Sequence, residues 1–195
     1  MTSSNRRKPT LLVALAALAA VLSAAAGAAE PEKTRTQTAI ENAAGPLMDD
    51  VEWRTPNPDF SDPATTPKDY AVRFRWGPYK QHIVGELVGV YETAKGPKEA
   101  QYWSFMTYHN PVTDEVTAMQ ISWDGSLGVG PVTRRADGAT VIEQIFYNAD
   151  GAMKFVRHEE FIAKGADSYE SKVYERDETG AWKLKREWTW TRVKK

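Results

Sequence analysis

Two arginines occur in segments where aromatic residues recur at every second or fourth position. They are the residues best suited to hold a negatively charged ligand. Arg186 shares its parity with Trp188 and Trp190, and Arg157 shares its parity with Phe161. In a strand, residues of one parity lie on one face, and a face rich in tryptophan points to the interior. A bare interior guanidinium costs several kcal/mol, so it pairs with an acid or meets an anion. We therefore expect an apolar cavity in which Arg186, with Arg157, holds a carboxylate, or alternatively an internal arginine–glutamate pair.

Aromatic residues of earlier segments are expected to line the same cavity. Tyr70, Val72, Phe74 and Trp76 alternate with smaller or charged residues, and Tyr102 belongs to a second aromatic segment. The predicted ligand-binding residues are Arg186, Arg157, Trp188, Trp190, Trp76, Phe74 and Tyr102.

The histidines offer a catalytic alternative. His158 and Glu160 share one side of a predicted strand, and His82 and Glu86 form a second such pair. A histidine–carboxylate pair at the mouth of a barrel would suit a hydrolase or an isomerase, whereas a solvated strand position explains the same residues without catalysis. His158 and Glu160 are the candidate catalytic residues on this hypothesis. The three histidines match no zinc-ligand spacing, and the serines lack the context of a nucleophile elbow, so we expect no metal and no cofactor.

The first 29 residues have the pattern of a secretory signal peptide. Three basic residues at positions 6–8 precede an uninterrupted apolar run at 11–26, which ends in small residues at 27–29. The run is shorter than the ~20 residues that span a bilayer, which argues against a retained anchor. We expect cleavage after Ala29 and a mature chain that is periplasmic or secreted.

The remaining 30–195 segment has the composition of a β-rich domain. Lys plus Arg falls from 25 to 22 while Asp plus Glu stays at 26, so the net charge moves from -1 to -4. A mildly acidic chain has no electrostatic reason to coat nucleic acid or anionic lipid. Only four leucines remain, against 13 valines and 21 aromatic residues, and these types favour strands. The chain has no cysteine, which excludes disulfides and thiolate chemistry.

Regularly spaced turn signals divide the domain into strands. Asp-Gly pairs occur at 124–125, 137–138 and 150–151, and such pairs between alternating apolar runs favour hairpins. Gly85 and Gly89, four apart on one face, predict a bulge or a strong bend. The pattern predicts nine strands, at 70–76, 81–92, 100–108, 115–123, 127–135, 139–148, 153–163, 168–176 and 181–193. Such an antiparallel meander is expected to close into an all-β, up-and-down barrel of about eight to ten strands.

Residues 30–68 are expected to form a polar segment and a proline-rich loop that pack on the barrel domain at 69–195. A short helix is expected at 38–44, and residues 47–54 are expected to form a first strand or a turn of helix. Four prolines between 55 and 67 disfavour regular structure around them.

This layout resembles the calycins, the class of up-and-down barrels that includes the lipocalins, the fatty-acid-binding proteins and small bacterial lipocalin-like domains. The resemblance rests on the meander at 70–193 and on its last segment, Trp182-Lys-Leu-Lys-Arg-Glu-Trp-Thr-Trp-Thr-Arg192. In such families an arginine late in the last strand packs on a tryptophan early in the domain, which implies a contact between Arg192 and Trp53. The sequence departs from the lipocalin signature at 51–53, where the Gly-x before the tryptophan is missing.

The sequence thus predicts an exported β-barrel that binds a small hydrophobic or amphipathic ligand, with an acidic group as one option. An envelope enzyme with a histidine–carboxylate pair, and a structural or interaction module with a filled core, are the alternatives. Strands with charges on the face opposite their aromatic residues argue against membrane insertion of the mature chain. Oligomeric state and ligand identity are left open.

Overall fold

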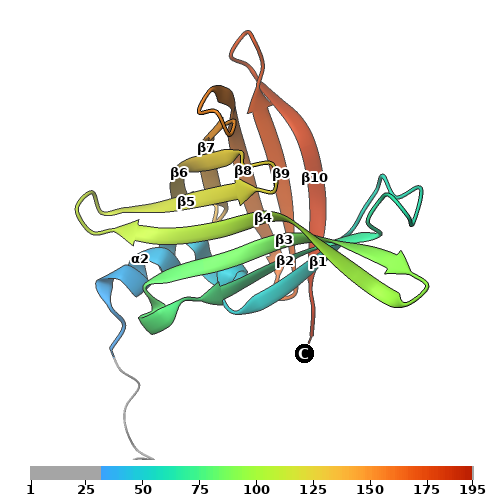
Figure 1. Cartoon of the computed structure of the whole chain (residues 1–195). Coiled ribbons are helices and arrows are strands. Elements are labelled where there is room, and N and C mark those ends of the chain that lie inside the picture. The colour runs from blue at the N-terminus through green and yellow to red at the C-terminus, as the bar shows by residue number, and fades with distance from the viewer. Residues whose placement is uncertain (1–31, 195) are drawn as a thin grey trace, which may run out of the picture. The chain divides into compact units, whose positions relative to one another are not determined.

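The computed structural model describes residues 32–194, which form an antiparallel β-barrel of ten strands (Figure 1). Each strand pairs with its neighbour in sequence, and β1 closes the ring by pairing with both β2 and β10. The predicted fold class is therefore confirmed, whereas the predicted signal peptide lies outside the described residues. The strands are β1 (Val51–Pro56), β2 (Asp69–Trp76), β3 (His82–Thr93), β4 (Gly96–Asn110), β5 (Glu115–Ser122), β6 (Leu127–Arg134), β7 (Thr140–Tyr147), β8 (Met153–Gly165), β9 (Ser168–Arg176) and β10 (Trp182–Arg192).

The closing strand β1 is the tenth, beyond the nine predicted after residue 69. Trp53 lies opposite Val72 of β2 and Arg192 of β10. The guanidinium carbon of Arg192 is 4.9 Å from the centre of the Trp53 ring, which confirms the contact that the calycin resemblance implies. The Trp53 indole also donates a hydrogen bond to the carbonyl of Leu47 at 2.8 Å. A buried tryptophan thus joins the first strand, the last strand and the segment before the barrel.

The Asp-Gly hairpins form as predicted. Gly125, Gly138 and Gly151 have φ values of 80°, 87° and 85°, which glycine adopts without the clash of a Cβ atom. At each turn the aspartate carboxylate accepts a hydrogen bond from the backbone N–H two residues later, as Asp137 does from Ala139 at 3.0 Å. This side-chain bond fixes the turn and with it the register of the two strands.

The strand register shifts at four places, and two of these shifts decide which side chains near the site face inward. The β3–β4 register shifts between Leu87 and Val88, inside the stretch that the paired glycines mark. A second shift lies between Leu184 and Arg186 in β10. Because a bulge reverses the alternation, Trp182 and Leu184 do not share the inner face with the later tryptophans, and they are 38% and 50% exposed. Strict alternation counted back from Trp188 predicts Trp182 and Leu184 on the inner face, and this prediction is wrong.

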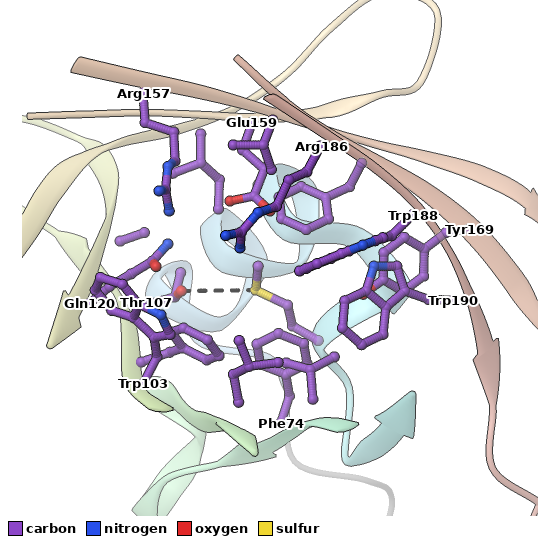
Figure 2. A pocket seen from close by; sticks show the side chains of 18 of the residues that line it. Phe74, Trp103, Thr107, Gln120, Arg157, Glu159, Tyr169, Arg186, Trp188 and Trp190 are labelled. Carbon is purple, nitrogen blue, oxygen red and sulfur yellow. Dashed lines mark hydrogen bonds between the residues drawn. The ribbon is translucent and has the colours of Figure 1, made fainter. Parts of the chain in front are cut away.

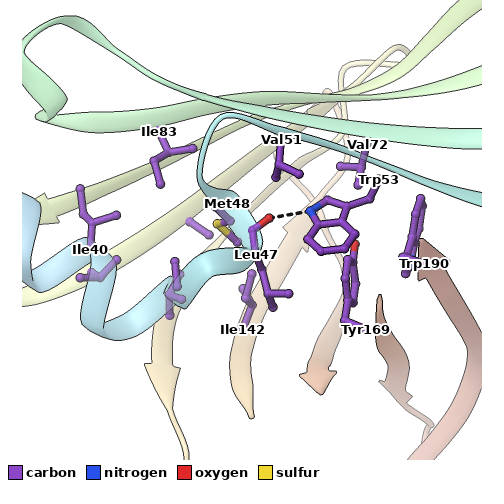
Figure 3. Close-up of a cluster of buried hydrophobic side chains, with 14 residues drawn as sticks. Ile40, Leu47, Met48, Val51, Trp53, Val72, Ile83, Ile142, Tyr169 and Trp190 are labelled. Carbon is purple, nitrogen blue, oxygen red and sulfur yellow. Dashed lines mark hydrogen bonds between the residues drawn. The ribbon is translucent and has the colours of Figure 1, made fainter. Parts of the chain in front are cut away.

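A helix and a short 3-10 turn lie across one end of the barrel (Figures 1 and 3). Helix α2 (Arg35–Ala44) begins three residues before the predicted start, because the Thr34 hydroxyl caps it by accepting from the backbone N–H of Gln37. Its C-terminal carbonyls at Ala43 and Ala44 accept hydrogen bonds from the buried Thr140 hydroxyl of β7. The 3-10 turn η2 (Gly45–Met48) follows, and a second one, η3 (Pro78–Lys80), links β2 to β3.

The main core lies between this end plug and the barrel wall. Figure 3 shows the plug residues facing strand residues from opposite sides of the barrel. The buried members are Ile40, Ala44, Leu47, Met48, Val51, Trp53, Val72, Ile83, Val116, Ala118, Val132, Ile142, Tyr169 and Trp190. The core therefore fills one end of the barrel and leaves the other end to the cavity described next.

Candidate ligand-binding site

A cavity of about 360 Å³ lies inside the barrel above the plug (Figure 2). Met48 from η2 reaches its floor, where the Thr107 hydroxyl lies 3.8 Å from the methionine sulfur. The apolar lining consists mainly of Val72, Phe74, Leu87, Trp103, Phe105, Ile142, Phe161, Tyr169, Val173, Trp188 and Trp190. Seven of these eleven side chains are aromatic, so most of the wall is flat and rigid.

The aromatic wall is held in place by specific contacts. Trp190 stacks on Tyr169 with an interplanar angle of 13°, and its indole donates to the Ser171 hydroxyl at 2.9 Å. Trp188 meets Trp190 edge-on and stacks on Tyr70 of β2. Aromatic contacts of these kinds favour one arrangement of the rings. The shape of this side of the cavity is therefore preformed.

The opposite part of the wall carries charge. Glu159 of β8 and Arg186 of β10 both lie beside Val173 of β9 in the strand register, so they belong to one row on the inner face. Figure 2 shows the carboxylate and the guanidinium directed into the cavity. Among the described residues, Arg186 has no carboxylate oxygen within 4.0 Å, and its guanidinium carbon lies 5.4 Å from the centre of the Trp188 ring. Arg186 is thus an exposed cation at the edge of an aromatic cavity.

Arg157 is held more tightly than Arg186. Its Nη2 donates to the Glu175 carboxylate at 3.1 Å, and its guanidinium lies 4.6 Å from the ring centre of Phe146 and 5.0 Å from that of Phe155. Its Nε is buried without a hydrogen-bond partner. A buried donor without a hydrogen-bond partner costs about 1–3 kcal/mol of stability. The donor here is part of a charged side chain on the cavity wall. Close approach of the Phe146 ring is possible because β6 has Gly128 beside it, where a Cβ would come within 2.4 Å of the ring.

Glu159 has an unusual titration. Burial raises the pKa of the Glu159 carboxyl above its ordinary value of 4.5, while the positive charges of Arg157 and Arg186 act in the opposite direction. A raised pKa increases the share of the neutral acid at any given pH, relative to a free carboxyl group. When Glu159 is protonated, Arg157 remains balanced by Glu175, and the positive charge of Arg186 is left without a counter-charge in its row. The site then has an electrostatic preference for an anion.

Five of the seven predicted ligand residues line this cavity: Phe74, Arg157, Arg186, Trp188 and Trp190. Trp76 and Tyr102 do not. The Trp76 indole donates to the Asp49 carboxylate at 2.8 Å, near the plugged end. Tyr102 lies at the β3–β4 bulge, where its hydroxyl shares a hydrogen bond with the hydroxyl of Tyr91.

The lining also contains polar residues that the sequence interpretation did not assign to the site. Gln120 of β5 lies between the buried Ala118 and Ser122, and its amide donates to Gln144 at 2.8 Å. Glu175 and Thr107 are further members. Counting alternate positions along β5 from Val116 would have placed Gln120 on the inner face. Glu175 could not be assigned in this way, because its place in the lining depends on its pairing with Arg157.

The candidate catalytic pair forms, but outside the cavity. His158 Nε2 and the Glu160 carboxylate are 3.2 Å apart, and the same carboxylate accepts from Arg135 at 2.6 Å. Both residues alternate with Arg157 and Glu159, which line the cavity, so they lie on the outer face of β8. Neither His82 nor another histidine occurs among the described lining residues. A histidine–carboxylate pair at the cavity mouth is therefore not found in residues 32–194.

Within the same residues, no three side chains of His, Asp or Glu are grouped to hold a metal ion, and no helix is long and apolar enough to cross a bilayer. No protein-family profile matches the sequence, and a comparison with curated proteins finds none that is similar. What the cavity binds is therefore inferred from its own side chains.

Proposed function

We propose that this protein binds one small amphipathic acid, with the acidic group at Arg186 and Arg157 and the apolar body among the aromatic rings. The observation that carries the proposal is Arg186, a cation directed into an apolar cavity without a carboxylate partner among the described residues. Ligand cavities combine an apolar lining with a few polar groups that fix orientation. The charged wall opposite Trp103 and Phe74 has this composition.

The size of the cavity limits the ligand. One water molecule takes about 30 Å³ of the liquid, and a methylene group takes a similar volume. A cavity of about 360 Å³ then accepts about a dozen non-hydrogen atoms. Decanoate has this size, a single carboxylate and a flexible apolar chain, which makes it a suitable probe. The open volume favours this function over a structural module with a filled core.

The lining favours binding over catalysis. Its ionisable side chains are Arg157, Glu159, Glu175, Lys185 and Arg186, and its Thr107 hydroxyl is directed to a methionine sulfur. Arginine stays protonated and so does not serve as a general base. The Glu175 carboxylate is paired with Arg157 at 3.1 Å, and the described lining holds no histidine, cysteine or serine that Glu159 could activate. Charges of both signs on a rigid wall are suited to orienting a ligand.

Export is the second part of the proposal. The pattern of residues 1–29 supports a mature chain that begins at Glu30 and works outside the cytoplasm. Amino-terminal sequencing of the protein expressed from its full-length gene tests this point. Glu30 at the new terminus is the expected result, and an intact Met1 in the processed fraction would contradict it.

Native mass spectrometry tests the binding. We expect the purified protein to show one equivalent of added decanoate, and no such adduct with decylamine, whose charge is repelled by Arg186. Equal binding of both probes would show that the charged wall does not select an acid. Absence of a decanoate adduct under gentle ionisation would contradict the proposed function.

A further inference from the structure

The outer face of the barrel carries a continuous apolar row, of which only Met119 is also among the residues that line the cavity. The row follows the strand register across six strands, because each member is the Cα partner of the next. Its members, from β3 to β8, are Val84, Met106, Met119, Val129, Ile145 and Val156. Residues that alternate with them, such as Gln120 and Gln144, are buried on the inner side, so the row lies on the outside.

A second apolar row runs beside the first. It contains Ile121, Leu127, Tyr147 and Met153, again joined by register, and Trp123 extends it beyond the end of β5. Several of these side chains are strongly exposed: Trp123 by 78%, Met153 by 66%, Ile121 by 45% and Ile145, in the first row, by 40%. We call the two rows together the apolar face.

The rest of the outer wall differs sharply from the apolar face. Arg73 of β2 binds Glu52 at 2.8 Å and also contacts Glu86 and Glu99 on the neighbouring strands. Lys172 of β9 binds Glu187 of β10 at 3.0 Å. By contrast, the outward positions of β5 from Thr117 to Ile121, and those of β6 from Leu127 to Pro131, carry no charged side chain. The outer wall of β5 and β6 is therefore apolar, and the nearest outward carboxylates border it at Glu86 on β3 and Glu143 on β7.

A partner for this face must pack flat upon it. All ten described strands are paired on both sides, so the barrel offers no edge to which another strand could add. Two sheets that pack face to face bury their side chains in a layer about 10 Å thick. The apolar face, whose first row crosses six strands and whose second row crosses four, has the form that such packing requires.

We propose that the occupant is a second copy of this chain, related to the first by a two-fold axis through the apolar face. In a two-fold interface the same patch meets itself, and an uncharged patch does so without like-charge repulsion. Homodimer interfaces are more apolar than those of transient partners, whose polarity resembles the remaining surface. Methionine and aromatic residues are enriched at interfaces, and this face contains Met106, Met119, Met153, Tyr147 and Trp123.

The apolar face can form the centre of a dimer interface. Its first row crosses six strands and its second row four, so at ~4.8 Å between strands and ~6.6 Å between successive outward positions the two rows cover on the order of 300 Å² of the wall. A stable dimer buries about 800 Å² on each partner, so the apolar face supplies the core of the interface and the surrounding polar residues supply its rim. The inference is independent of the ligand, because none of the exposed residues Ile121, Trp123, Ile145 and Met153 lines the cavity.

Sedimentation velocity over a wide concentration range tests the dimer. We expect the wild-type protein to sediment as a dimer and Ile145→Asp to raise the dimer dissociation constant at least about tenfold, as at a central interface residue. Leu184→Asp is the matched control, since Leu184 is 50% exposed on β10, outside the apolar face, and should leave the dimer intact. Trp123→Ser provides a second variant should Ile145→Asp not fold.

Three results would overturn the inference. They are a wild-type protein that is monomeric at every concentration, a dimer that neither Ile145→Asp nor Trp123→Ser weakens, and a dimer that Leu184→Asp weakens as much as they do. A monomer that sediments with neutral phosphatidylcholine vesicles would also overturn it, and would identify a lipid surface as the occupant instead.

Discussion

Replacement of Arg186 by glutamine should separate recognition of the acid from recognition of the apolar body. The substitution removes a cavity cation that has no carboxylate oxygen within 4.0 Å among the described residues, and it keeps a polar side chain of similar reach. Arg157 is less suitable, because its removal would leave the Glu175 carboxylate without the partner at 3.1 Å. The buried Trp190 on the same strand should stay packed in the variant.

The structure sets the size of the effect. A hydrogen bond to a charged group contributes about 1.5–3 kcal/mol, which corresponds to a factor of about 10 to 150 in affinity. Arg186 is exposed at the cavity mouth, where solvent screens its charge. We therefore expect the low end of this range, a loss of about tenfold in decanoate affinity.

Isothermal titration calorimetry with two probes measures the effect. Decanoate should bind Arg186→Gln more weakly than wild type, whereas decanol, which has no charge, should bind both proteins equally. Lys172→Gln is the control for net charge, because Lys172 lies on the neighbouring strand β9 and pairs with Glu187 on the outer wall at 3.0 Å. It should bind decanoate as the wild type does.

Two outcomes would refute this reasoning. If Arg186→Gln binds decanoate with unchanged affinity, the acid does not contact Arg186. If decanol and decanoate lose affinity together, the variant has altered the shape of the cavity, and its charge is not what recognises the ligand.

Three further predictions follow from the same contacts. Protonation of Glu159 removes a negative charge beside Arg186, so decanesulfonate, which does not titrate, should bind more tightly as the pH falls through the raised pKa of Glu159. Glu159→Gln should lose this pH dependence. Calorimetric titrations at a series of pH values measure it, and equal pH dependence in the two proteins would contradict the prediction. Trp53→Ala should lower the free energy of unfolding in urea by about 3–5 kcal/mol, because the Trp53 side chain is only 2% exposed. Tyr79→Ala is the control and should change this free energy by less than about 0.5 kcal/mol, because Tyr79 is 91% exposed. Similar effects of the two substitutions would contradict the packing of Trp53. Gly130→Ala should cost about 1–3 kcal/mol, since its Cβ would lie 1.7 Å from a backbone carbonyl oxygen of β7, and an unchanged melting temperature would contradict this.

Turn chemistry and alternation account for what the sequence could predict of the fold. Asp137-Gly138 and the other two Asp-Gly pairs form their hairpin turns through local contacts. The positions of these turns can therefore be predicted from the sequence alone. Strand β1 is different, because a proline-rich stretch separates it from β2 and only its pairing with both β2 and β10 shows that it belongs to the barrel.

The candidate site was predictable in its faces but not in its height along the barrel axis. Alternation placed Phe74 and Trp76 on the same inner face, yet Phe74 lines the cavity and Trp76 lies near the plugged end, bonded to Asp49. The bulge between Leu184 and Arg186 depends on the pairing of β10 with β9, and no residue type in the sequence indicates it. For the same reason the apolar face was not foreseen, since Val129 and Ile145 become neighbours only through register.

A crystal structure of the protein with decanoate tests the central claim most directly. The account predicts one decanoate in the cavity, with its carboxylate within hydrogen-bond distance of Arg186 and its chain between Trp103 and Trp188 above Met48. A cavity filled by the protein's own side chains, or a decanoate whose carboxylate points away from both arginines, would contradict it.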